Sequence, residues 1–197
     1  MRASTISRDR ALELLKQFNK EAFHIEHALT VEAVMAYMAE NLGYREEKNY
    51  WALVGLLHDI DFEQYPDKHL EHTPQILREA GVDEDMIRSV VSHGYGICSY
   101  VEPQHQMEKV LFAIDELSGL IGAAALVRPS KSVSDMGLSS IKKKFKSKGF
   151  AAGCDRDTIQ KGADSLGWTL DELIDKTLEA MQATEEEIRG KLLNAGP

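Results

Sequence analysis

Apolar residues recur every three or four positions along most of this chain, and this spacing constrains the fold more than any other feature. It is clearest at Ala11, Leu14, Leu15 and Phe18, and again at Ala28, Val31, Val34, Met35 and Met38. Such spacing gives a helix one apolar face that a core can bury. The alternating pattern of a β-strand never extends beyond a few residues, and there is no internal repeat. The sequence therefore predicts an all-α fold.

Glycines and capping residues predict where the helices begin and end. Gly43 is expected to end the second helix in a left-handed conformation. A third helix should begin near Arg45 and run into the pair His58-Asp59. Further helices are predicted at about 73–80, 83–91 and 106–121, with loops at 61–67 and near 94–103. Two capping boxes that open at Thr169 and Thr184 predict two more helix starts.

The composition changes after Pro129, which suggests how the chain is organised. Residues 130–140 are rich in serine, and residues 142–148 contain five lysines. A chain of 197 residues can form one domain with a core, with or without a helical appendage. We predict a helical-bundle domain over residues 1–128, with its core motifs at about 20–125. Residues 129–197 should form a C-terminal helical extension that packs on it.

Charge and cysteine content exclude several classes of protein. A formal net charge of −9 argues against nucleic acid as a partner, because the phosphate backbone favours basic proteins. Cys98 and Cys154 have no paired spacing, which is typical of a reducing compartment. The first eight residues lack the apolar stretch of a secretion signal, and the apolar run near 121–127 is too short to span a bilayer. We expect a cytoplasmic protein without a membrane partner, and the oligomeric state stays open.

Ionisable residues stand at positions where the helical pattern predicts burial. His58-Asp59 follows the apolar run 51–57, and Asp115 has apolar neighbours on its own predicted helix. A buried charge must be paired, solvated or bound to a metal, since an unpaired one is very costly. Imidazole and carboxylate together suit zinc, iron, manganese and related divalent ions. For Asp115 taken alone, a buried carboxylate that caps a helix or pairs with a lysine or arginine is the favoured interpretation.

Three segments together resemble the H…HD…D pattern of the HD-domain superfamily of metal-dependent phosphohydrolases. They are His27-Ala-Leu-Thr-Val31, Leu56-Leu-His-Asp-Ile60 and Ala113-Ile-Asp115, and the resemblance covers about residues 20–125. His58-Asp-Ile-Asp61 stands where the HDIG subgroup has its name-giving tetrad, with Asp61 in place of glycine. The resemblance implies a helical HD-domain bundle in which four side chains hold a divalent metal: His27, His58, Asp59 and Asp115.

Two further histidines match positions of metal ligands in bimetallic members of that superfamily. His69 precedes an apolar helix, and His93 ends the following one. If both are ligands, the site holds two ions and Asp59 is the natural bridge between them. Otherwise one of the two histidines only orients substrate or water. The resemblance implies one or two divalent ions, with Mn, Mg, Co, Zn or Fe as candidates.

The same resemblance suggests roles in catalysis and in substrate binding. A divalent ion lowers the pKa of a bound water and neutralises phosphoryl oxygens. Asp59 is the candidate to orient that water or to accept its proton, and His93 the candidate to contact the phosphate or the leaving group. Arg128, Lys131 and the lysine-rich segment around Lys144 are candidate anion contacts. A solvated lysine-rich face is the alternative for most of these lysines.

The function expected from these features is hydrolysis of a phosphoester in a nucleotide or another small phosphorylated metabolite. A di-iron oxygenase that resembles myo-inositol oxygenase is an alternative, because the same six candidate ligands would suit it. A non-catalytic module that binds a metal or a nucleotide is a second alternative. Such a module is expected to lack at least one core ligand, whereas all four are present here. The substrate itself stays open.

Overall fold

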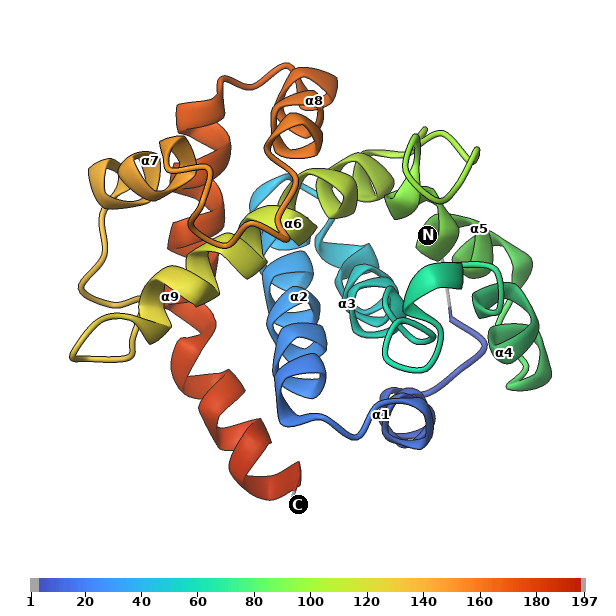
Figure 1. The fold of residues 1–197 in the computed structure, drawn as a ribbon. Helices are drawn as coiled ribbons and strands as arrows, with labels where there is room; N and C mark the ends of the chain where they lie inside the picture. Colours follow the sequence, from blue (N-terminus) through green and yellow to red (C-terminus); the bar gives the residue numbers. More distant parts are fainter. Residues whose placement is uncertain (1–3, 196–197) are drawn as a thin grey trace.

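A computed structural model describes residues 4–195, and all regular secondary structure in that range is helical (Figure 1). An isolated bridge between Tyr95 and Ser99 is the one β-type pairing among these residues. None of the described helices combines the length and the hydropathy that crossing a bilayer requires. The predicted all-α fold is confirmed.

The α-helices run in chain order as α1 (Arg8–Phe18), α2 (Ala22–Asn41), α3 (Lys48–Leu57), α4 (Thr73–Glu79), α5 (Glu84–Val91), α6 (Gln106–Leu126), α7 (Leu138–Lys146), α8 (Arg156–Leu166) and α9 (Leu170–Ala195). Single 3₁₀ turns occur at η1 (Arg45–Glu47), η2 (Pro66–Lys68) and η3 (Ser92–Gly94). The helix expected from Arg45 therefore starts as a 3₁₀ turn and becomes α-helical at Lys48. The left-handed stop predicted at Gly43 is confirmed by its φ of 87°.

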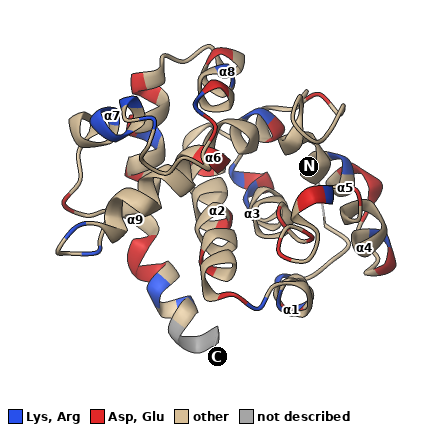
Figure 2. Ribbon diagram, viewed as in Figure 1, with Lys and Arg blue, Asp and Glu red and all other residues tan. Residues whose placement is uncertain are grey.

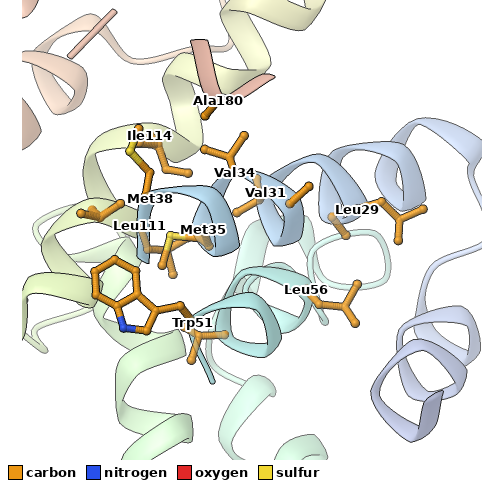
Figure 3. Packing of buried hydrophobic residues seen from close by; sticks show 14 of the residues in the cluster. Leu29, Val31, Val34, Met35, Met38, Trp51, Leu56, Leu111, Ile114 and Ala180 are labelled. Carbon is orange, nitrogen blue, oxygen red and sulfur yellow. The ribbon is translucent and has the colours of Figure 1, made fainter. Parts of the chain in front are cut away.

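The core surrounds α2, which packs against α3, α6 and α9 (Figure 1). Figure 3 shows side chains of α2 meeting side chains of those three helices: Val31, Val34, Met35 and Met38 of α2, Trp51 and Leu56 of α3, Leu111 and Ile114 of α6, and Ala180 of α9. A helix with buried side chains on several faces belongs in the centre of a bundle. This central position carries the residues of α2 to the junction of α3 and α6.

Two glycines let helices approach one another unusually closely. A Cβ atom on Gly55 of α3 would lie 2.9 Å from the carbonyl oxygen of Val31 in α2. A Cβ atom on Gly162 of α8 would lie 2.5 Å from Cα of Ala113 in α6. Both distances are below van der Waals contact, so only glycine fits at these crossings. The C-terminal end of α3 is thereby held against α2, and α8 against α6.

The chain after residue 128 packs on the helices before it. In Figure 1, α9 passes behind α6 and runs beside α2, and α8 lies above α6. One hydrophobic cluster extends from Ile6 to Ile188 and includes buried residues on both sides of residue 128. The division into a domain over 1–128 and an extension over 129–197 stays a prediction.

The two predicted capping boxes have different outcomes. The box at Thr169 is confirmed, because Glu172 N donates to Thr169 Oγ1 at 3.2 Å and Thr169 N donates to Glu172 Oε2 at 2.7 Å. The helix start predicted at Thr184 is wrong. Thr184 lies inside α9, where its hydroxyl donates to the carbonyl oxygen of Ala180 at 2.8 Å. Buried residues such as Ala180 and Ile188 continue the apolar face past Thr184, so the helix does not break there.

Candidate metal centre

The four residues predicted as core ligands converge at one point in the bundle. His27 comes from α2, His58 and Asp59 follow the last turn of α3, and Asp115 lies in the middle of α6. One ligand atom from each of the four lies within 4.8 Å of the others. His27 Nε2 is 3.0 Å from Asp115 Oδ1, and His58 Nε2 is 3.3 Å from both Asp115 Oδ1 and Asp59 Oδ2.

A second group of side chains adjoins the first and shares Asp59 with it. His69 and His93 place their Nε2 atoms 3.3 and 3.4 Å from Asp59 Oδ1. The two Nε2 atoms are 3.1 Å apart. One carboxylate oxygen of Asp59 therefore faces the second group while the other faces His58 of the first. A carboxylate placed in this way could contribute one oxygen to each group.

Backbone carbonyls fix the orientation of two of these imidazole rings. His58 donates through Nδ1 to the carbonyl oxygen of Gly55 at 2.7 Å. His93 donates through Nδ1 to the carbonyl oxygen of Val90 at 2.6 Å. Histidine ligands of metals commonly donate their other N–H in this way, which fixes the tautomer and the ring plane. Both rings thus present Nε2 to the centre.

Asp61 orients the ring of His69 and also holds the loop that follows it. Its carboxylate accepts a hydrogen bond from His69 Nδ1 at 2.9 Å. It also accepts from the backbone N–H groups of Leu70, His72 and Thr73, at 3.2, 3.2 and 3.0 Å. Sequence reasoning noted Asp61 only as a substitute for glycine. An acidic residue two positions after a candidate ligand was the available signal.

The donor atoms fit a divalent ion. His58 is fully buried, and its Nε2 has no hydrogen-bond partner. Ligand atoms at 2.0–2.1 Å from an octahedral ion lie about 3 Å from their nearest neighbours. Most of the separations, at 3.0–3.4 Å, match this spacing, and His27 Nε2 lies farther from Asp59 Oδ2, at 3.9 Å. Nitrogen and carboxylate donors in this proportion suit transition metals better than an all-oxygen site would.

The comparison with known families agrees with this geometry. The family model described as HD domain matches residues 24–120, a range that contains all six candidate ligands. Residues 24–120 form an HD domain. Members of that family are generally metal-dependent hydrolases. No curated protein and no solved structure shows significant similarity to the chain. Membership of the HDIG subgroup stays a prediction, because Asp61 replaces its glycine.

The electrostatics of the HD domain keep the two central carboxylates charged. Burial alone would lower the pKa of His58, but Asp59 and Asp115 together raise it well above its ordinary value. Burial opposes ionisation of Asp59 and Asp115, yet the charge of His58 and hydrogen bonds from histidines hold both pKa values below their usual range. A metal must therefore compete with protons for the imidazoles and not for the carboxylates.

A cavity of about 360 Å³ between the HD domain and the segment 153–158 opens onto both groups of ligands. Its walls are largely apolar or aromatic and include Phe23, Phe62, Ile97 and Phe112. Cys98, Cys154 and Glu116 add two thiols and one further carboxyl group. Burial and the neighbouring Asp115 raise the pKa of Glu116 to about 7. The residues that line this cavity include no lysine or arginine.

The three predicted anion contacts lie outside that cavity. Arg128 pairs with Asp135 at 2.8 Å, and Lys144 lies on the lysine-rich helix α7 with its Nζ 4.3 Å from the ring centroid of Phe150 (Figure 2). Lys131 lines an adjacent cavity, which also includes His27. A role of these residues in substrate binding stays a prediction, and of the three Lys131 has the best position for it.

Proposed function

We propose that this protein is a phosphohydrolase that uses two divalent ions to cleave a phosphoester of a small phosphorylated metabolite. The observation that carries the proposal is the division of the Asp59 carboxylate between two groups of histidines. Two-metal sites of this kind clamp the attacking and the leaving oxygen of a phosphoryl group. The HD-domain family, whose members are generally metal-dependent hydrolases, supports the same reaction class.

Each candidate ligand has a part in this mechanism. His27, His58 and Asp115 would hold one ion with Asp59, and His69 and His93 would hold the other. When bound, the ions would supply a water of lowered pKa and positive charge for the phosphoryl oxygens.

Asp59 is assigned to orient that water or to accept its proton. His93 can offer only Nε2 to the site, because its Nδ1 is bound to the carbonyl of Val90. His93 therefore either completes the second ion site or contacts the phosphoryl group.

The proposal is tested by metal analysis combined with a substrate panel. Protein purified without chelators should contain up to two divalent ions per chain. Phosphomonoesters, cyclic nucleotides and nucleoside triphosphates are then offered with Mn, Mg, Co, Zn or Fe. Metal-dependent cleavage that is lost in Asp59→Ala supports the proposal. A protein with two ions that cleaves none of these esters contradicts it.

A di-iron oxygenase is the second candidate, and the composition of the cavity favours it. The six candidate ligands are four imidazoles and two carboxylates, and the cavity beside them has no basic residue to receive a phosphate. Two irons per chain together with substrate-dependent oxygen uptake would support this candidate. A non-catalytic metal-binding module would instead bind metal and show neither reaction, although the full set of core ligands argues against it.

A further inference from the structure

The charge around the candidate metal centre limits which phosphoester it can accept. The six candidate ligands include two carboxylates, so two divalent ions would leave a surplus of two positive charges. One phosphoryl dianion balances that surplus. A second or third phosphate would have no lysine or arginine to meet it within this cavity and would lie near Glu116 instead, because Lys131 and Arg189 line only the adjoining cavity, where Arg189 is already paired with Glu185. Unpaired charges in such a site are costly. The centre therefore fits a single phosphate better than a nucleoside di- or triphosphate.

The walls of the cavity favour an apolar partner for that phosphate. Seven large hydrophobic residues are exposed in the described part of the chain, and three of them line this cavity: Phe23, Phe62 and Ile97. Phe23 and Ile97 are 62% and 60% exposed. Exposed apolar residues gathered at a pocket are typical of a binding site for an apolar group.

A second, largely apolar cavity of about 130 Å³ adjoins the first between α2, α6 and α9. Phe23, His27 and Gly119 line both cavities, so the two meet beside a candidate metal ligand. Its apolar wall is completed by Gly122, Ala125, Leu126, Val133, Met181, Ile188 and Leu192. Glu26, Thr30, Ser118, Lys131, Glu185 and Arg189 line it as well, and Arg189 pairs with Glu185 at 3.0 Å. We call this second cavity the α2–α6–α9 groove.

Two glycines on α6 leave the groove open. A Cβ atom on Gly122 would meet nothing within 4 Å, and one on Gly119 would meet only Cys154 Sγ at 3.5 Å. Neither glycine is required by a close helix crossing or by a positive φ. The free space that these positions leave has apolar side chains along one wall, charged and polar side chains at other positions, and adjoins the candidate metal centre.

We propose that the substrate is a phosphate monoester of an apolar alcohol, with its phosphoryl group at the metal centre and its apolar part in the α2–α6–α9 groove. The chemistry of this inference rests on the proposed function, whereas the binding mode rests on the groove. Hydrolysis would form a bond from the water oxygen to phosphorus and break the bond from phosphorus to the ester oxygen. The products are inorganic phosphate and the alcohol, which takes up the proton that the water releases.

Binding of three alkylphosphonates, which have no ester bond to cleave, tests the groove independently of turnover, and ADP serves as the nucleotide for comparison. Protein loaded with Mn²⁺ is titrated calorimetrically with methyl-, butyl- and hexylphosphonate and with ADP. Affinity should rise with each added methylene, by up to about fourfold for full burial. Hexylphosphonate should also bind more tightly than ADP. Equal affinity for the three phosphonates, or a preference for ADP, would overturn the inference.

Two pairs of variants locate the site of that selectivity. Gly122→Leu fills the groove, while Gly190→Leu adds the same side chain to α9 at a glycine that also faces open space and lines neither cavity. Gly122→Leu should weaken binding of hexylphosphonate by about tenfold or more and leave methylphosphonate unchanged. Gly190→Leu should change neither.

The second pair, Leu126→Asp and Val127→Asp, replaces exposed neighbours of which only Leu126 lines the groove. Because both side chains are exposed, neither change threatens the fold. Leu126→Asp should weaken the binding of hexylphosphonate but not that of methylphosphonate, whereas Val127→Asp should weaken neither. Identical behaviour of the two variants would contradict the assignment of the groove.

Hydrolysis of methyl, butyl and hexyl phosphate separates this inference from the proposed function. If kcat/KM rises with chain length and falls selectively in Gly122→Leu, both are supported. If the affinity for the phosphonates rises with chain length but no ester is cleaved, the assignment of the groove is supported and the proposed hydrolysis is wrong. If esters are cleaved without regard to chain length, hydrolysis stands and the inference is wrong.

Discussion

Asp61 accepts a hydrogen bond from Nδ1 of His69 at 2.9 Å, so the residue that takes the place of glycine in the HDIG tetrad orients a candidate ligand of the second ion. The same carboxylate accepts three backbone N–H groups of the segment 70–73. The orientation of the His69 ring is therefore coupled to the conformation of the segment 70–73, because the same carboxylate holds both.

Asp61→Asn should weaken the second ion site and the fold together. The amide offers one acceptor oxygen in place of two, which leaves buried donors unpaired at a cost of about 1–3 kcal/mol. Loss of the hydrogen bond to His69 should lower the affinity for the second ion by about 10–100-fold. Titration with Mn²⁺ and thermal unfolding measure the two effects. The control is Asp67→Asn, an exposed residue of the same loop. Wild-type affinity for two ions in Asp61→Asn would refute the assigned role.

Asp59→Ala should remove both ions, because its two oxygens face the two groups of histidines separately. Hydrolysis should fall to background while the helical content stays nearly unchanged. Asp115→Ala is the contrast, because Asp115 faces only His27 and His58. This substitution should remove only the ion that these residues would hold. Elemental analysis with far-ultraviolet circular dichroism distinguishes the variants. Retention of full occupancy and activity by Asp59→Ala would show that the site is misassigned.

His69→Ala should reduce the number of bound ions from two per chain to one. The variant keeps the four core ligands but loses one of the three side chains of the second group. Elemental analysis of both proteins in excess metal gives the stoichiometry. One ion per chain in the wild type, with unchanged affinity in the variant, would mean that the centre is mononuclear.

The pH dependence of the metal-free protein should show the environment of His69. Burial lowers its pKa, but hydrogen bonds with Asp59 and Asp61 outweigh burial and raise the pKa from 6.5 to about 9. Because the folded pKa lies above the unfolded one, the stabilisation is complete below pH 6.5 and is lost as the pH rises through 9. Urea unfolding between pH 6 and pH 10 measures this loss, which His69→Ala should reduce but not abolish, because the pKa of His58 is raised as well. Affinity for metal should change oppositely, by about tenfold per pH unit for the displaced proton.

Lys131→Gln should raise KM for an anionic substrate by a few-fold, whereas Lys144→Gln should not. Lys131 and His27 both line the α2–α6–α9 groove, whereas Lys144, on α7, places its ammonium group over the ring of Phe150. The effect should weaken at high ionic strength, because the Debye length falls from about 10 Å at 0.1 M salt to about 3 Å at 1 M. Equal effects of the two substitutions would mean that the whole lysine-rich region attracts substrate.

Most of the fold could be predicted from the sequence, because helical periodicity is a local property. Each apolar face shows in the order of residues, and Gly43 marks a stop that only its own backbone conformation needs. The helix start predicted at Thr184 was wrong because a local pattern carries no information about tertiary packing. A local capping pattern was overruled by the burial of Ala180 and Ile188 in the tertiary structure.

The candidate ligands were also predictable, since ionisable residues at apolar positions need an explanation wherever the chain folds. His58, Asp59 and Asp115 stand out in the sequence alone for this reason. Only the tertiary structure decided that the two oxygens of Asp59 face different groups of histidines and that Asp61 orients His69. It also decided that no lysine or arginine lines the cavity beside these residues. These properties depend on the close crossings of α3 with α2 and of α8 with α6, which join residues far apart in the sequence.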